Sequence, residues 1–172
     1  MKIALAGTHG TGKTTIIDEL KPLNVIREVS RKAIKKFGMN PQNMSPEQLD
    51  CFQKYIFWKQ IAEETRKDDF FSDRSLYDIL AYSQNIPWYD EMIEDFQKYR
   101  KQSKYDIVFF FLIEFPMEQD GVRPEDEEYR VEIEKRILAL FEEYGQKYIV
   151  VRWTVRERAE IIKKAIMAYS PQ

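Results

Sequence analysis

Eight residues near the N-terminus form the most specific chemical pattern in this chain. Residues 7–14 read GTHGTGKT and match the pattern G-x-x-x-x-G-K-[ST] at every fixed position. Backbone N–H groups in such a loop turn towards phosphate oxygens, and the unpaired N–H groups of the following helix point the same way. We therefore predict that the loop binds the phosphates of a nucleoside triphosphate. The residues predicted to do so are Gly7, Gly10, Thr11, Gly12, Lys13, Thr14 and Thr15.

The residues on both sides of this loop supply the structural context that the pattern requires. Residues 2–6 are an apolar run typical of a buried strand, and residues 15–20 read as the beginning of a helix. In this context Lys13 is expected to reach the outer phosphates, and the Thr14 hydroxyl is expected to hold Mg²⁺. Triphosphate binding is thus the first function that the sequence predicts.

A second chemical pattern, Asp73-Arg74-Ser75, follows the short apolar run at residues 70–72. An acidic residue that ends a buried strand beside a phosphate loop is suited to hold magnesium, directly or through its waters. We therefore assign Asp73 to the metal, and we expect the planar guanidinium of Arg74 to pair with a phosphate. The alternative is that Asp73 only caps the helix that starts near Ser75.

These two patterns are positioned by a chain that alternates short strands with helices. Such alternation predicts an α/β fold with one five-stranded parallel sheet covered by helices on both faces. Ligands bind beyond the carboxyl ends of the strands in such sheets, so the phosphate loop, Glu28, Asp73 and the chain after Leu112 should meet at one cleft. The predicted strands cover residues 2–6, 24–27, 70–72, 107–112 and 148–151. The predicted helices cover residues 15–20, 30–37, 46–66, 76–84, 89–101, 127–144 and 154–169.

Length and composition limit the classes of protein to consider. The 172 residues fit a single domain over residues 1–172, and 44% hydrophobic residues supply its core. A formal net charge of -2 gives no field that would collect nucleic acid, so a nucleic-acid partner is unsupported but not excluded. The single Cys51 cannot form an internal disulfide, no signal-like segment precedes the first strand, and no apolar run approaches the roughly 20 residues that cross a bilayer. We therefore expect a cytoplasmic protein with no membrane partner.

Together, these motifs resemble those of small P-loop kinases of the thymidylate kinase and deoxynucleoside kinase type. The chain is also similar to the kinase domain found with nicotinamide riboside kinase activity. The resemblance implies a P-loop kinase fold with the phosphate-loop strand central and an arginine-bearing lid around residues 115–130. It also implies a phosphotransferase that moves the terminal phosphate of ATP, with Mg²⁺, to a nucleoside or nucleoside monophosphate. The motifs that carry the resemblance are residues 7–14, Asp73-Arg74-Ser75 with the following Leu76-Tyr77-Asp78, and residues 120–123.

The resemblance also implies roles for single residues. Asp73 matches the magnesium-associated carboxylate, Arg74 the arginine that grips the acceptor or the transferring phosphate, and Arg123 a lid arginine. Glu28 and Arg31 are similar to the acidic and basic residues that follow the second strand in these enzymes. In nucleoside kinases such a carboxylate can take the proton of the attacking hydroxyl, whereas nucleotide kinases need no such base.

Several side chains keep two interpretations. Glu28 is either a base for the acceptor or a solvated side chain paired with Arg27 or Arg31. Tyr55, on the long helix that follows residue 45, either packs in the core or stacks on a planar substrate. His9 is expected to face solvent from a variable position of the phosphate loop.

Two other functions compete with a small-molecule kinase. The first is a kinase that acts on a modified base or end of DNA, which Lys and Arg gathered beside the cleft would favour. The second is a P-loop ATPase or nucleotide switch that acts with a protein partner, although the sequence contains no N-K-x-D guanine signature. Independently, the segment around residues 115–130 is either a lid or an ordinary acidic surface loop. The sequence assigns neither an acceptor nor an oligomeric state.

Overall fold

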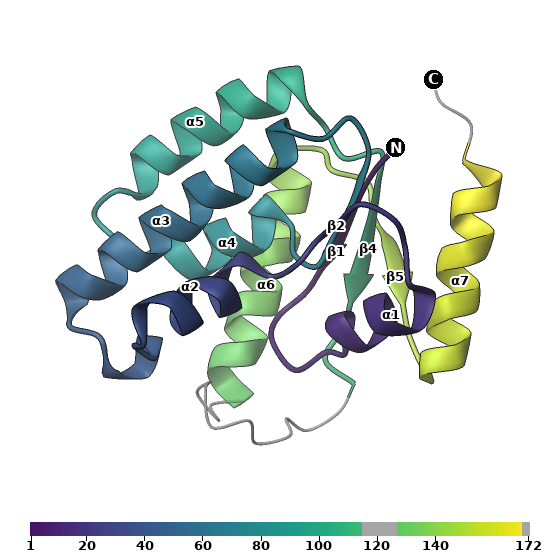
Figure 1. The fold of residues 1–172 in the computed structure, drawn as a ribbon, viewed down its shortest axis with the longest axis horizontal. Helices are drawn as coiled ribbons and strands as arrows, with labels where there is room; N and C mark the ends of the chain where they lie inside the picture. Colours follow the sequence, from purple (N-terminus) through teal and green to yellow (C-terminus); the bar gives the residue numbers. More distant parts are fainter. Residues whose placement is uncertain (115–126, 170–172) are drawn as a thin grey trace.

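The five strands form one parallel sheet with helices on both faces (Figure 1). The computed structural model describes residues 1–114 and 127–169. The strands pair in the order β2-β3-β1-β4-β5, and every pairing is parallel. The predicted fold class is therefore confirmed, with the phosphate-loop strand β1 in the centre. The strands are β1 (Lys2–Ala6), β2 (Val25–Ile26), β3 (Phe70–Ser72), β4 (Ile107–Phe111) and β5 (Ile149–Val151).

Seven α-helices and one 3₁₀ turn accompany the sheet within the described residues. The predicted second strand is shorter than expected, because Asn24 adopts a left-handed φ of 55° that a strand does not accommodate. None of the helices in the described part of the chain combines the length and the apolar composition that a membrane span needs. The helices are α1 (Lys13–Leu20), α2 (Val29–Phe37), α3 (Pro46–Thr65), α4 (Leu76–Ser83), α5 (Tyr89–Gln102), α6 (Glu127–Glu143) and α7 (Val155–Ala168), and the 3₁₀ turn is η1 (Pro41–Asn43).

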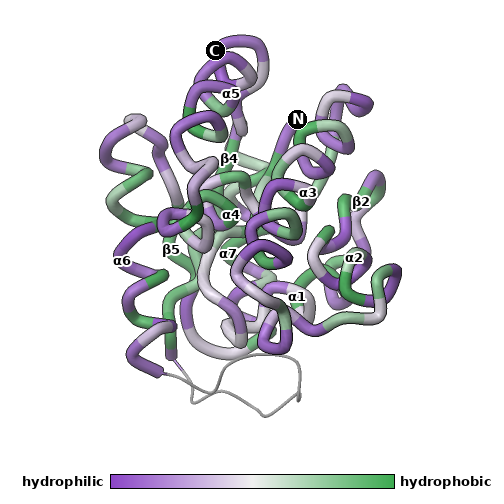
Figure 2. Tube along the Cα trace, turned by 90° about the vertical axis from the view of Figure 1, so that its left-hand side faces the viewer, coloured by the Kyte–Doolittle hydropathy of each residue, from purple (hydrophilic) through white to green (hydrophobic). Residues whose placement is uncertain are grey.

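The strands bury apolar side chains on both faces, as the unbroken apolar run of β4 requires. Val108 and Phe110 of β4 lie in the core cluster that packs against α2 to α6. Ile107, Phe109 and Phe111 lie in the cluster that packs against α1 and α7. Figure 1 shows α1 and α7 on one side of the sheet and the other helices across it, and Figure 2 shows β4 and β5 mainly in green. The sheet is thus the middle of three layers.

The phosphate loop follows the carboxyl end of β1, and two of its glycines are required by the backbone. Gly7 has a φ of 136°, and a Cβ atom there would lie 2.5 Å from the carbonyl oxygen of Phe111. Gly12 has a φ of 85° and is the N-cap residue of α1. A side chain at either position would be strained, and at Gly7 it would also collide with the end of β4. The glycines therefore allow the loop to pack closely at the carboxyl edge of the sheet.

Candidate active site

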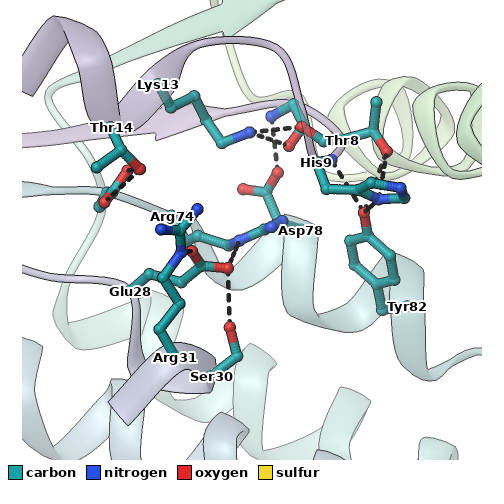
Figure 3. Close-up of polar contacts among 12 residues, drawn as sticks. Thr8, His9, Lys13, Thr14, Glu28, Ser30, Arg31, Arg74, Asp78 and Tyr82 are labelled. Atoms are coloured by element: carbon teal, nitrogen blue, oxygen red, sulfur yellow. Dashed lines mark hydrogen bonds and ion pairs between the residues drawn. The ribbon is translucent and has the colours of Figure 1, made fainter. Parts of the chain in front are cut away.

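The side chain of Lys13 lies inside the phosphate loop (Figure 3). Its Nζ donates hydrogen bonds to the carbonyl oxygens of Gly7 at 2.7 Å and Thr8 at 2.6 Å, and to Thr11 Oγ1 at 3.1 Å. Burial, together with the positive charge of Arg74, lowers the pKa of Lys13 to about 7. A bound triphosphate would oppose this shift, because negative charge favours the protonated amine. Lys13 therefore lies inside the loop, and its role in binding phosphate stays a prediction.

The Thr14 hydroxyl and the Asp73 carboxylate, the two predicted metal ligands, meet at the start of α1. Thr14 Oγ1 donates to Asp73 Oδ2 at 3.1 Å and lies 3.3 Å from Oδ1. Burial and the negative charge of Glu28 raise the pKa of Asp73, so a cation at this place would stabilise the carboxylate. Among the described residues no group of three or more His, Cys, Asp and Glu side chains could hold a metal ion. Thr14 and Asp73 nevertheless offer a hydroxyl and a carboxylate oxygen, which suit Mg²⁺ that takes its other ligands from phosphates and water.

Ser75, rather than Asp73, caps helix α4. The Ser75 hydroxyl oxygen accepts a hydrogen bond from the Asp78 backbone N–H at 3.2 Å, and Asp78 Oδ2 accepts one from the Ser75 backbone N–H at 2.7 Å. These two bonds form a capping box and satisfy the first turn of the helix. The alternative that Asp73 serves only as this cap is therefore wrong.

Glu28 is a buried carboxylate held by two arginines (Figure 3). Arg74 Nε donates to Glu28 Oε1 at 3.0 Å, and Arg31 Nε donates to Oε2 at 2.7 Å. The Ser30 hydroxyl donates to Oε1 at 2.8 Å. Only 6% of Glu28 is exposed, and Arg27 forms its ion pair with another carboxylate. The alternative of a solvated Glu28 on the surface is therefore wrong.

Arg74 keeps one hydrogen-bond donor that has no partner among the described residues. Its Nη1 is buried and forms no hydrogen bond with the residues that the structure describes. Its guanidinium carbon lies 5.4 Å from the centre of the Tyr82 ring. Burial alone would lower the pKa of Arg74, but the neighbouring negative groups, Glu28 foremost, hold it above its ordinary value. The charged guanidinium is suited to bind an oxygen of a phosphate or of an acceptor.

A pocket of about 440 Å³ opens beside Glu28 and Arg74, and this volume is typical of small-molecule sites. Two buried amides, Gln53 and Gln60, belong to its wall. Most of the remaining wall is apolar. A ligand would therefore bury most of its surface against apolar side chains, and a few polar groups would fix its orientation. The apolar lining includes Val29, Ile34, Leu49, Phe52, Ile56 and Ile79.

Of the residues predicted to bind the acceptor, Glu28, Arg31 and Arg74 line this pocket and Tyr55 does not. The Tyr55 ring instead packs edge-on against Phe37, with 5.3 Å between the ring centres. The stacking role predicted for Tyr55 is therefore wrong, because helix α3 turns this side chain away from the lining face.

Two predicted site residues remain, Thr15 and Arg123. Thr15 is exposed on the first turn of α1, beyond the buried part of the loop. Arg123 lies outside the described residues, so its role as a lid arginine stays a prediction.

Helix α4 makes contacts with the phosphate loop that the sequence did not predict. His9 is only 3% exposed rather than solvent-facing, and its Nδ1 lies 2.7 Å from the Tyr82 hydroxyl. The Gly7 backbone N–H donates to Asp78 Oδ1 at 2.7 Å. The expectation for His9 is therefore wrong. The available signal was the i,i+4 spacing of Asp78 and Tyr82, which places both on one face of the predicted helix.

A further unpredicted contact joins helix α7 to the loop. Arg158 is buried, and its Nη1 donates to the carbonyl oxygen of Thr11 at 2.7 Å. Its Nη2 donates to Glu114 Oε2 at 2.5 Å, and Glu114 also accepts the Trp153 backbone N–H at 3.0 Å. Because Arg158 and Thr11 are separated by 147 positions, no local pattern could have revealed this contact. The phosphate loop is therefore held from both α4 and α7.

A phosphate loop after the central strand, with an Asp-Arg pair at the end of the neighbouring strand, defines a P-loop phosphotransferase of the nucleoside and nucleotide kinase type. The chain belongs to the AAA domain family, whose model matches residues 2–158. It is 30% identical to a probable thymidylate kinase from Methanocaldococcus jannaschii over 184 residues, which covers 98% of this chain and 95% of that protein. The class of enzyme predicted from the sequence is therefore confirmed.

Solved structures share the fold at lower sequence identity. A deoxyadenosine kinase from M. mycoides with dCMP and dCDP bound has a TM-score of 0.68 at 18% identity, covering 98% of this chain and 100% of that one. The NadR protein in complex with NR has a TM-score of 0.72 at 16% identity. That comparison covers 98% of this chain but 50% of the NadR chain. These likenesses establish the architecture described above.

Proposed function

We propose that this protein is an ATP-dependent kinase that transfers the terminal phosphate of ATP to a nucleoside or nucleoside monophosphate, and that a nucleoside hydroxyl is its preferred acceptor. Glu28 carries this proposal, because it is a buried carboxylate in the wall of a small-molecule pocket, ion-paired to Arg74 beside the phosphate loop. A hydroxyl must lose its proton when it attacks phosphorus, and a carboxylate within reach can accept that proton.

The proposed reaction is an in-line displacement at the terminal phosphorus. The acceptor oxygen forms the new P–O bond, its proton passes to Glu28, and the bond to the oxygen shared with the next phosphate breaks to release ADP. In this proposal Lys13 and Arg74 offset the negative charge that spreads over the transferred oxygens. Glu28 is itself held in position by its hydrogen bonds to Arg31 and Arg74.

The donor half of the reaction is supported by the loop and by the family. Thr14 and Asp73 would hold Mg²⁺, which when bound would draw electron density from the phosphate oxygens. We keep three expectations as predictions that accompany this proposal: a single domain over residues 1–172, a lid around residues 115–130, and a cytoplasmic location.

Gln53 supports a nucleobase as part of the acceptor. Its Oε1 lies 3.4 Å from the Ser83 hydroxyl, but that hydroxyl donates at 2.7 Å to the carbonyl oxygen of Ile79, so the contact with Gln53 is weak. No other hydrogen bond of the Gln53 amide is formed with the described residues. The amide thus offers a donor and an acceptor side by side, which matches the edge of a nucleobase.

A screen of acceptors tests the proposal. Purified protein is incubated with ATP, Mg²⁺ and each of the common ribo- and deoxynucleosides and their monophosphates, and ADP and phosphorylated product are both measured. We expect one group of nucleosides to give product in amounts equal to the ADP formed, and a Lys13→Ala variant to give none. Folded protein that binds ATP but phosphorylates no member of the panel would contradict the proposal.

A nucleoside monophosphate is the second candidate acceptor, because a relative 30% identical over nearly the whole chain is named a probable thymidylate kinase. Phosphorylation of dTMP with no turnover of nucleosides would select it. Two added assays cover the alternatives from the sequence. Label transfer to a DNA oligonucleotide would favour a polymer kinase, and ATP hydrolysis without any acceptor would favour an ATPase.

A further inference from the structure

We propose that Tyr82 is a positioning residue that sets the conformation of the phosphate loop from the wall of the acceptor pocket. Its hydroxyl contacts the loop, and its ring faces the pocket and Arg74. The part of the proposal that concerns the acceptor rests on the proposed kinase function, whereas the part that concerns ATP does not. The loop and the pocket would then be linked through one side chain.

The Tyr82 hydroxyl meets three polar atoms of the loop (Figure 3). Its oxygen accepts the His9 backbone N–H at 3.1 Å. It also lies 2.7 Å from His9 Nδ1 and 3.0 Å from Thr8 Oγ1. We assign its single proton to His9 Nδ1, the nearest acceptor, so that the Thr8 hydroxyl donates to the phenol and His9 carries its proton on Nε2. One phenol thereby orients two successive loop residues, in both backbone and side chain.

The ring of the same residue belongs to the acceptor side. Tyr82 lines the pocket, and the guanidinium carbon of Arg74 lies 5.4 Å from its ring centre. The Tyr129 ring, which also lines the pocket, stands at 63° to the Tyr82 ring with 6.1 Å between centres. A ligand in the pocket would restrict this ring, and the phenolic oxygen is rigidly attached to it. Restriction of the ring therefore also restricts the contact with the loop.

A second anchor on the same face of α4 makes the link stiff. Asp78 precedes Tyr82 by four positions, so both side chains leave the helix on one side. Asp78 accepts the Gly7 N–H while Tyr82 contacts Thr8 and His9, so α4 holds three successive residues of the loop. A small displacement of α4 by an acceptor would reach the loop at two points. Because such coupling is reciprocal, ATP binding would favour the position of α4 that the acceptor favours, and it would therefore strengthen binding of the acceptor.

ATP binding in the absence of any acceptor tests the loop half of the proposal. Tyr82→Phe removes the hydroxyl and keeps the ring, so we expect its Kd for Mg-ATP, measured by titration calorimetry, to rise about fivefold, as for the loss of one net hydrogen bond. Tyr77→Phe is the matched control, because it removes a buried hydroxyl of the same helix that bonds instead to Arg100 and Gln146. An unchanged Kd for Tyr82→Phe, or an equal rise for Tyr77→Phe, would overturn the proposal.

Variants of His9 test whether the hydrogen bond itself is responsible. His9→Asn places an amide oxygen near the position of Nδ1 and should keep an ATP affinity close to that of the natural protein. His9→Ala removes only the Nδ1 contact, so its Kd should rise, but by no more than that of Tyr82→Phe. The double variant Tyr82→Phe/His9→Ala should bind ATP no more weakly than Tyr82→Phe alone, because Tyr82→Phe already removes the contact that His9→Ala removes. Additive losses would show that the two residues act independently and would sink the proposal.

Steady-state kinetics with the acceptor found in the screen test the pocket half. We expect Tyr82→Phe to change kcat and the KM for ATP while the KM for the acceptor stays unchanged. Tyr82→Leu, which also removes the ring, should raise the acceptor KM as well. A Tyr82→Phe variant that raises only the acceptor KM would place the hydroxyl on the acceptor and contradict a role towards the loop. Failure of the screen would reject the kinase function and leave the ATP-binding result intact.

Discussion

Two carboxylates are buried in this molecule in contrasting surroundings. Glu28 lies in the wall of the pocket, and its two oxygens are ion-paired to Arg31 and Arg74. Glu64, near the C-terminal end of helix α3, is fully buried and does not line this pocket.

Neutral donors hold Glu64. Its oxygens accept hydrogen bonds from Gln60 Nε2 at 2.7 Å, from the Tyr105 hydroxyl at 2.8 Å and from the Tyr99 hydroxyl at 2.9 Å. Burial raises the pKa of Glu64 to about 7, against the effect of these donors. Tyr105 in turn accepts the backbone N–H of Leu76, the first residue of α4. Through Tyr105, Glu64 thus stabilises the start of helix α4, which directly follows Asp73 and Arg74.

The comparison separates the carboxylate that we propose for chemistry from a carboxylate that supports the structure. A buried charge needs compensation in either setting, but cations beside a pocket leave the carboxylate within reach of a ligand. Neutral donors in a closed interior satisfy every oxygen and leave nothing for a ligand to contact. Burial and a shifted pKa alone therefore do not mark a functional group in this fold; access and the charge of the partners do.

The largest effect is expected for Glu28→Gln, which keeps the size of the side chain and removes its capacity to take a proton. We expect kcat with a nucleoside acceptor to fall about 10²- to 10⁴-fold, as for the loss of a general base. Glu64→Gln is the matched control and should keep kcat near that of the natural protein at pH 8. Equal kcat values for the two variants would contradict a role of Glu28 as the general base.

Arg74→Lys should have the next largest effect. Lysine cannot offer one nitrogen to Glu28 and another to a ligand in a fixed plane, so we expect kcat/KM for the acceptor to fall about tenfold or more. Arg31→Lys is the control, because the Arg31 side chain is 53% exposed and its ion pair is more screened. Steady-state kinetics of the two variants decide the matter, and an equal or larger loss in Arg31→Lys would contradict the assignment.

Glu64→Gln should change the pH dependence of stability rather than the chemistry. Because the pKa of Glu64 is raised from 4.5 to about 7, the folded state holds more protons than the unfolded state between these values. The contribution of Glu64 to the free energy of unfolding is therefore full below pH 4.5 and is lost as the pH rises through about 7. Urea unfolding from pH 5 to pH 8 should show that the stability of Glu64→Gln relative to the natural protein improves with pH. A constant difference would show that Glu64 does not titrate in this range.

Tyr105→Phe should have the smallest effect on catalysis, and it tests the structural role of Glu64. The variant removes one donor to Glu64 and the acceptor of the Leu76 N–H, and we expect a loss of about 1–3 kcal/mol in the free energy of unfolding. The KM values for ATP and for the acceptor should stay unchanged. A selective rise in either KM without loss of stability would mean that the Glu64 network acts on the site.

Local patterns were sufficient to predict the helices and strands and to place the phosphate loop and Asp73-Arg74 at strand ends. Strand, glycine loop and helix follow one another without interruption, so residues 2–20 could be interpreted without the rest of the chain. Asp73 and Arg74 were also accessible, because a short apolar run places them directly at a strand end. The parallel sheet then brought both patterns to one edge.

The acceptor half depended on helix rotation and on long-range contacts, and there the sequence was insufficient. On α3, Leu49, Phe52, Gln53 and Ile56 form the stripe that faces the pocket. With 100° of rotation per helical residue, Tyr55 lies roughly 100° around the helix from the centre of this stripe. Only the packed structure shows which face of α3 lines the pocket. The residues around His9 likewise do not show its burial, because its partner on α4 is 73 positions away; the i,i+4 spacing of Asp78 and Tyr82 shows only that these two side chains share a helix face.

The double role of Asp78 has a consequence for how this protein reaches its native state. One carboxylate completes the first turn of α4 through Ser75 and also fixes Gly7 across 71 positions of chain. Contacts of such separation must overcome the entropy of closing a long loop, so they form after local helices do. We therefore expect the phosphate loop to be among the last parts of the chain to become ordered during folding, after strands β1 and β3 have paired.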